Sequence, residues 1–228
     1  MVVILVALMF IAFVTIDAVM ERRRRARLLR VGESLHDAVR ESEPTWVAGF
    51  ELPPPMHYHQ GHMWAHWVGP DQAYIGVDDF GRRLLGKVDK LSPPSLGAFV
   101  HQGEPAVKVR RRGEEVELLS PLGGEIIAVN PELKRDPSLM HKDPYGHGWL
   151  FKVRSPHLYQ QLSSLLSGSL AKRWMEDVRD RFQHQLMLAT GSVIQDGGAT
   201  VDDIGEHLDH EAWSKLVDEF LLQDERTR

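Results

Sequence analysis

The sequence contains no cysteine. This absence excludes disulfide bonds, thiolate zinc sites, iron–sulfur clusters and cysteine nucleophiles. The chain also lacks an excess of basic residues, because its net charge is −5 over 228 residues, so no nucleic-acid partner is expected. There is no glycine-rich phosphate loop before a helix and no serine with the spacing of a nucleophile elbow. The sequence therefore offers no recognisable catalytic motif, although its 43% hydrophobic content can form one core with appendages or two small domains.

An almost uninterrupted apolar run opens the chain and extends to residue 20. As a helix it would be about 28 Å long, which is enough to cross the hydrocarbon core of a bilayer. Its charged residue, Asp17, lies near the far end, and four arginines follow at positions 22–25. A cleaved signal peptide would have positive charge before the run and small residues at the cut site. We therefore predict a single transmembrane anchor in the inner membrane with the body in the cytoplasm. The alternative is a buried helix of a globular domain.

The segment after the anchor changes from helical to proline-rich character. A narrow apolar stripe runs through residues 21–43, and its arginines would lie against anionic headgroups or form a solvated stalk. Pro44 and then Pro53–Pro55 interrupt any helix and favour an extended connector. The sequence thus predicts a basic juxtamembrane helix followed by a linker.

Short strands begin near residue 62. Ala73, Ile75 and Val77 alternate with Tyr74 and Gly76, which is the two-residue period of a half-buried strand. The same alternation predicts a hairpin of two strands joined by a turn at a glycine, and then two further strands. These elements are expected at residues 107–110, Gly113, 116–119, 125–129 and 149–153.

Helical spacing takes over after Pro156. It predicts either one long amphipathic helix or two with a joint at Gly168, and then a loop at Asp196–Gly198. A final helix is expected from residue 210 to residue 222, capped by Asp209. Residues 196–228 include ten acidic and three basic side chains, which would suit a basic partner. The apolar faces of these helices either pack on the β domain or dock a partner protein.

Four sequence blocks in the β region resemble the glycine cleavage system H protein family, in the family's order and at close to its spacing. The resemblance implies a mainly β fold, namely a lipoyl/biotinyl-like barrel-sandwich domain with an N-terminal transmembrane helix and a C-terminal helical extension added. The blocks are Gly61–Val68, Tyr74–Val88, Ser120–Asn130 and Asp143–Lys152.

The sequence is accordingly divided into four parts. Residues 1–20 are the expected transmembrane anchor, and residues 21–61 are the basic juxtamembrane helix and proline-rich linker. Residues 62–154 are the H-protein-like β domain, and residues 155–228 are the helical C-terminal extension.

The family carries lipoate on a hairpin lysine, a fixed number of residues before a serine–proline pair. Counting back from Ser120 places Gly113 at that position. Lipoate is joined through an amide to a primary amine, and glycine has none. No cofactor is therefore expected. The alternative is a lipoate carried on Lys108, five residues earlier and within the strand.

The resemblance implies a non-catalytic protein and leaves two hypotheses. The first is a membrane-tethered, non-lipoylated H-like protein that acts as a scaffold or subunit of a complex on the cytoplasmic face, with protein partners that the sequence does not identify. The second is an active lipoyl carrier of a glycine cleavage or related transfer system, lipoylated at Lys108. The residues expected at an interaction surface are Arg110, Arg111, Arg112, Gly113 and Trp213, and the arginines would also pair with glutamates across the hairpin.

Four histidines raise a further alternative, a metal-binding module. Imidazole nitrogens bind transition metals, but no second group of ligands completes a coordination shell in the sequence. We therefore expect packing or surface roles and no metal site. The histidines are His57, His59, His62 and His66.

Overall fold

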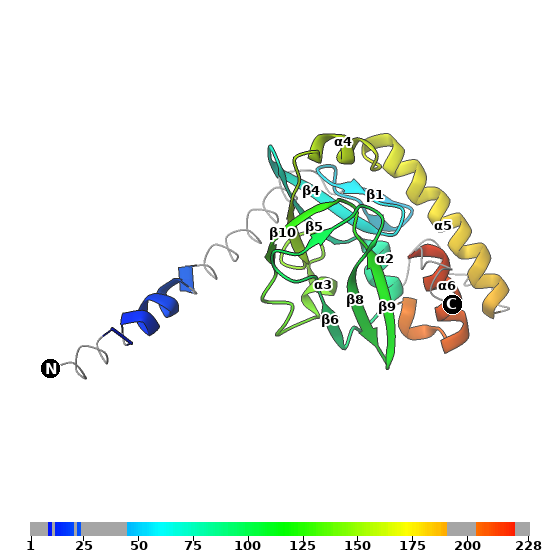
Figure 1. Cartoon of the computed structure of the whole chain (residues 1–228). Helices are drawn as coiled ribbons and strands as arrows, with labels where there is room; N and C mark the ends of the chain where they lie inside the picture. The colour runs from blue at the N-terminus through cyan, green and yellow to red at the C-terminus, as the bar shows by residue number, and fades with distance from the viewer. Residues whose placement is uncertain (1–8, 11, 21, 24–44, 191–203, 222–228) are drawn as a thin grey trace.

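The computed structural model describes most of the chain from residue 45 onward and part of its N-terminal segment (Figure 1). Predictions for the first residues, for the juxtamembrane helix and for the loop at Asp196–Gly198 lie outside the described residues. The described ranges are 9–10, 12–20, 22–23, 45–190 and 204–221.

The predicted anchor falls only partly within these ranges. Residues 12–20 are helical, whereas residues 1–8 and residue 11 lie outside the described part. Within the described part, no helix combines the length and the apolar character needed to cross a bilayer. The anchor therefore stays a prediction.

Two larger antiparallel sheets and one two-stranded sheet make up the described β domain. The larger has six strands in the order β3-β4-β5-β11-β10-β7, and the smaller has three in the order β6-β8-β9. The strands of the larger sheet are β3 (His57–Tyr58), β4 (Met63–Gly69), β5 (Gln72–Val77), β7 (Phe99–Val100), β10 (Gly124–Val129) and β11 (Phe151–Arg154). Those of the smaller sheet are β6 (Lys90–Ser92), β8 (Pro105–Arg111) and β9 (Glu114–Leu119).

Buried side chains from both sheets belong to one hydrophobic core. Ile75 and Phe151 come from the larger sheet, and Val109 and Leu118 from the smaller one, and all four are fully buried. The strands expected in these segments are confirmed, but β5 is buried on both faces and not on one, because Tyr74 and Gly76 are buried as well. The Trp64 ring packs closely against the backbone of Gly76, where any side chain would clash because a Cβ would lie 2.4 Å from the ring.

The β domain begins earlier in the chain than the sequence suggested. Part of the expected linker forms β1 (Trp46–Val47), β2 (Phe50–Glu51) and β3, and β1 pairs with β2. Phe50 and Met56 in this segment are fully buried. The prolines misled the prediction, because apolar residues on either side of them pack into the core.

A short helix, α2 (Asp79–Leu85), connects the two sheets. Asp78 caps it, with its side chain accepting a hydrogen bond from the Gly81 N–H, as is usual for aspartate at a helix start. Phe80 and Leu84 are fully buried. A shorter helix, α3 (Leu139–Lys142), lies in the segment between β10 and β11.

The C-terminal part is helical, as predicted. It comprises α4 (Leu158–Ser163), α5 (Gly168–Thr190), the 3₁₀ helix η1 (Ile204–His207) and α6 (His210–Phe220). Gly168, with φ of 54°, marks the joint that separates α4 from α5. The Asp209 side chain accepts a hydrogen bond from the Ala212 N–H and caps α6, which confirms the predicted cap. In Figure 1, α5 and α6 lie on the same side of the molecule as α2 and contact each other.

Candidate functional site

The hairpin β8–β9 ends in a two-residue turn formed by Arg112 and Gly113. Arg111 pairs with Glu114 across the base of this turn, and the turn residues have φ angles of 49° and 89°. Two positive φ angles are typical of a type I′ turn, which suits the twist of a hairpin. The Arg112 N–H donates a hydrogen bond of 2.7 Å to the Asp89 carboxylate, which fixes the turn against the segment before β6.

Gly113 lies in the turn where the sequence placed it. Its positive φ favours glycine, because a side chain in this region of φ and ψ is strained. A Cβ built at Gly113 would have no atom within 4 Å. The position is therefore open to solvent but carries no group that could be acylated, so the residue present does not fit an attached lipoate.

The solvent face of the hairpin carries paired charges. The Lys108 amine lies 2.8 Å from Glu115 and 3.1 Å from Glu117, and Arg110 lies 3.8 Å from Glu115. The cross-hairpin pairs predicted for the arginines are thus confirmed at Arg110. The hydrogen bonds that the Lys108 amine donates to Glu115 and Glu117 raise the pKa of Lys108, so the amine stays protonated at neutral pH.

The opposite face of the same strand buries an arginine. Arg111 follows Val107 and Val109 on the inward positions of β8 and is 3% exposed. Its guanidinium lies 4.4 Å from the centre of the Trp213 ring and donates to the Gly205 carbonyl oxygen. Burial and the neighbouring Arg112 charge lower the pKa of Arg111. The sequence had offered this residue for an external surface, but it faces the chain's own C-terminal part.

Glu206 in η1 forms an ion-pair network with the turn. Its carboxylate pairs with Arg112, lies 3.6 Å from Arg111, and accepts a 3.0 Å hydrogen bond from the Lys87 N–H. The Lys87 N–H and then the two guanidinium charges lower the pKa of Glu206 below its ordinary value. One carboxylate thus links the hairpin turn to Lys87, two residues after the end of α2.

Trp213 anchors α6 beside this network. The indole is 1% exposed, and its N–H donates a 2.8 Å hydrogen bond to the Leu84 carbonyl oxygen at the end of α2. His210, at the start of α6, lies 2.5 Å from Glu114 on the hairpin. We call residues 204–221 the docked extension. Of the two roles weighed for this apolar face, the structure shows packing against the domain itself.

Two members of this site, Glu206 and Asp89, were not predicted from the sequence. The excess of acidic residues in the C-terminal region indicated a basic binding partner, but the sequence analysis looked for that partner in another protein. The arginines of the hairpin turn are the basic groups that Glu206 meets. Glu206 lies 94 residues from Arg112, so no local pattern links them.

The four histidines lie in two neighbouring pairs, His57 with His66 and His59 with His62. His62 is 1% exposed, lies 2.8 Å from Asp78 through Nδ1, and stacks on Trp174 with ring centres 4.9 Å apart. The His59 ring accepts a hydrogen bond from the Gly61 N–H, and the His66 ring lies 3.3 Å from the Pro55 carbonyl oxygen. Burial lowers the pKa of His57, and the nearby His66 lowers it further.

Across the described ranges, no group of three or more histidine, aspartate or glutamate side chains is arranged to hold a metal ion. The metal-binding alternative on His57, His59, His62 and His66 therefore has no geometric support within the described residues. His59 and His62 each make a separate local contact.

Comparisons with known proteins show which family this chain is similar to. Residues 56–178, from β3 into α5, match the family model described as glycine cleavage H-protein. The glycine cleavage system H protein of Hydrogenovibrio crunogenus is 34% identical over 116 residues, which are 51% of this chain and 89% of that protein. The probable glycine cleavage system H protein 2 of Sulfurisphaera tokodaii is 33% identical over 130 residues, which are 55% of this chain and 86% of that protein.

A solved structure, the glycine cleavage system H protein of Mycobacterium marinum, is also similar. It has a TM-score of 0.47 and 22% sequence identity, and the match covers 56% of this chain and 98% of that one. The matched part of the chain is a mainly β domain of the lipoyl, barrel-sandwich type. The chain belongs to the glycine cleavage H-protein family.

Proposed function

We propose that this protein is a non-lipoylated H-like protein that acts by contact, as a scaffold or subunit of a complex on the cytoplasmic face of the inner membrane. It would be a non-catalytic protein without a cofactor, tethered through residues 1–20. The observation that supports this most directly is Gly113. The family's lysine position lies in an open turn, yet it holds a residue without an amine.

The surroundings of the turn support the same proposal. A carrier needs an arm that is free to move between sites, whereas Arg111 and Arg112 are held by Glu206. The docked extension also covers the end of α2 next to the hairpin, through the Trp213 hydrogen bond to Leu84. This arrangement favours a hairpin that is fixed in place over one that presents a swinging group.

The alternative is a lipoyl carrier modified at Lys108, as part of a glycine cleavage or related transfer system. Its support is that the Lys108 side chain is 53% exposed and lies on the correct hairpin. Against it, Glu115 and Glu117 both pair with the amine and keep it protonated. Acylation requires the neutral amine, so these pairs would slow it.

Intact mass of the native protein separates the two functions. We expect the unmodified mass, while a relative H protein expressed in the same cells gains the lipoyl increment and shows that the modifying enzymes are active. A lipoyl increment on this chain that disappears in Lys108→Arg would establish the alternative. Gly113→Lys tests whether an amine is all that the turn lacks, and its thermal melt shows whether the variant stays folded.

The scaffold role needs its own test, because an unmodified protein can also be inactive. Affinity capture from gently solubilised membranes should recover the same partner proteins with the wild type and with Lys108→Arg. A chain that starts at residue 21 should leave the membrane fraction and lose partners that reside there. Recovery of the chain as a monomer without reproducible partners would contradict the scaffold role.

A further inference from the structure

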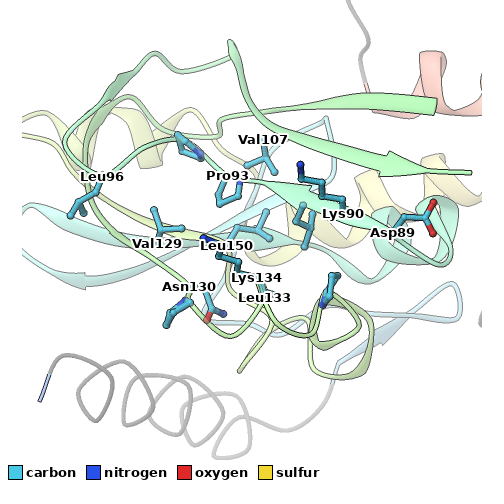
Figure 2. A pocket seen from close by; sticks show the side chains of 14 residues that line it. Asp89, Lys90, Pro93, Leu96, Val107, Val129, Asn130, Leu133, Lys134 and Leu150 are labelled. Carbon is cyan, nitrogen blue, oxygen red and sulfur yellow. The ribbon is translucent and has the colours of Figure 1, made fainter. Parts of the chain in front are cut away.

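A cleft of about 620 Å³ opens between the two sheets, on a part of the domain that the proposed function does not use (Figure 2). One wall is the segment that begins at Asp89 and passes through β6 to Leu96. The other wall is formed by the end of β10 and the loop that follows it, and the cleft reaches Val107 of β8 and Leu150. Ligand pockets in proteins commonly have volumes in this range.

The cleft is mainly apolar, and much of its lining is preformed. Val107, Leu133 and Leu150 are buried and belong to the hydrophobic core. Leu96 on the rim is 52% exposed, so an occupant would remove it from water. Prolines fix the backbone on both walls because their φ angle is locked, and they are Pro93, Pro94, Pro131 and Pro137.

Two lysines supply the polar character of the cleft. Figure 2 shows Lys90 and Lys134 among the apolar side chains, with Asp89 at one end and Leu96 at the other. Within the described residues, the Lys134 amine forms no hydrogen bond or ion pair. Lys90 interacts electrostatically with Glu115, so Lys134 is the better anchor for an anion.

The other polar groups of the cleft are already engaged. The Asn130 amide donates to the His147 and Trp149 carbonyl oxygens and accepts from the Glu132 N–H. Asp89 would repel an anion, but one of its oxygens accepts the Arg112 N–H and it lies at the end away from Leu96. The lining residues carry no arginine to clamp a phosphate.

We propose that this cleft binds an amphipathic carboxylate, with its apolar body between the two sheets and its carboxylate at Lys134, supported by Lys90. The apolar walls select for a hydrocarbon chain or ring system, and the amines select for a single negative charge. The proposal does not depend on whether the hairpin is lipoylated. Asp89 joins one end of the cleft to the hairpin turn, so an occupant would also contact the segment that positions Arg112.

A photoreactive decanoate tests the proposal on the full-length chain held in lipid nanodiscs, with cross-links mapped by peptide mass spectrometry and empty nanodiscs as the blank. We expect saturable labelling of peptides that contain residues 89–96 and 129–137, competed by unlabelled decanoate. Lys134→Gln should raise the decanoate concentration needed for half-maximal labelling by about tenfold, which is the loss of affinity expected for one charge-assisted contact. Lys90→Gln should have a smaller effect in the same direction.

Matched variants and probes decide the ligand class. Lys142→Gln removes a nearby lysine that pairs with Asp136 outside the cleft and should leave labelling unchanged. Leu96→Glu, at an exposed rim position, should weaken decanoate through repulsion while the fold is kept. A photoreactive decanol should label the cleft far more weakly than the acid.

Several results would overturn the proposal. They are the absence of saturable labelling, equal labelling by the acid and the alcohol, and labelling that Lys134→Gln does not weaken. These outcomes leave intact mass and partner capture unchanged, so a failure here is separate from a failure of the proposed function.

Discussion

The two faces of the β8–β9 hairpin carry similar charges in opposite surroundings. Lys108 and Arg110 lie on the exposed positions of β8, where they pair with Glu115 at side-chain exposures of 53% and 56%. Arg111, one residue further, is 3% exposed and contacts Trp213 and the Gly205 carbonyl oxygen. The strand alternation alone separates them.

The difference shows where the stability of the hairpin comes from. Exposed ion pairs typically contribute about 0–1 kcal/mol, because both groups stay hydrated and lose conformational freedom. A buried guanidinium has lost its water and depends on the groups that replace it. For Arg111 those groups belong to the docked extension. The contacts of the solvent face are therefore made within the hairpin, whereas the contacts of the covered face come from residues far along the chain.

The largest expected effect is on the covered face, at Trp213. Trp213→Ala removes a fully buried indole and its hydrogen bond to Leu84, and should lower the free energy of unfolding by about 3–5 kcal/mol. Chemical denaturation measures the loss. Trp67→Ala removes a 57% exposed indole and should change stability by no more than about 0.5 kcal/mol. Equal effects of the two variants would mean that α6 does not contribute to folding.

The two faces are compared directly by truncating their arginines. Arg111→Ala leaves the Gly205 carbonyl oxygen without its donor and removes one of the guanidinium groups near Glu206. It should lower the free energy of unfolding by about 1–3 kcal/mol. Arg110→Ala removes only an exposed pair, and should cost about 0.2–1 kcal/mol. Thermal or denaturant unfolding of both variants gives the two values. If Arg110→Ala were the more damaging, the assignment of the faces would be reversed.

The turn between the faces should be less sensitive. Gly113→Ala places a Cβ at φ of 89°, where no neighbour clashes with it, so the cost is backbone strain alone. We expect a loss of about 1–2 kcal/mol in the free energy of unfolding. Gly97→Ala, at φ of 79° and also without a near neighbour, is the matched control and should behave similarly. A clearly larger loss at Gly113 would indicate an additional role for the turn.

The smallest expected effect is the pH dependence that Glu206 contributes. Its pKa is lowered in the folded chain, so its stabilisation is fully present above its ordinary value of 4.5 and is lost as the pH falls through the lower folded value. Glu206→Gln should therefore destabilise the chain by under about 1 kcal/mol at neutral pH. The difference from the wild type should shrink as the pH falls below 4.5. Denaturant unfolding at neutral pH and below pH 4.5 measures it, and a difference that grows on acidification would contradict the assignment.

Local patterns predicted most of the fold but only part of the site. The alternation around Val107 and Val109 identified β8, and Asp209 identified the start of α6, because both signals lie within a few residues. The same alternation also places Arg111 on the inward side, which was a usable signal for its burial. The contact of Glu206 with the turn could not be predicted, because it joins segments that are far apart in sequence. The prolines at 53–55 concealed the strands around them for a related reason: burial of Phe50 and Met56 is decided by tertiary packing.

The open space around Gly113 makes the turn a convenient place for a probe. Because the sequence has no cysteine, Gly113→Cys would introduce a single thiol, and a spin label or fluorophore attached there would need no other residue removed. Paired with a second thiol on an exposed position of α6, such as Glu211, it would report the separation of the hairpin and the extension as a distance distribution. Because the natural sequence has no other thiol, the two labels would report only the distance between the hairpin turn and α6.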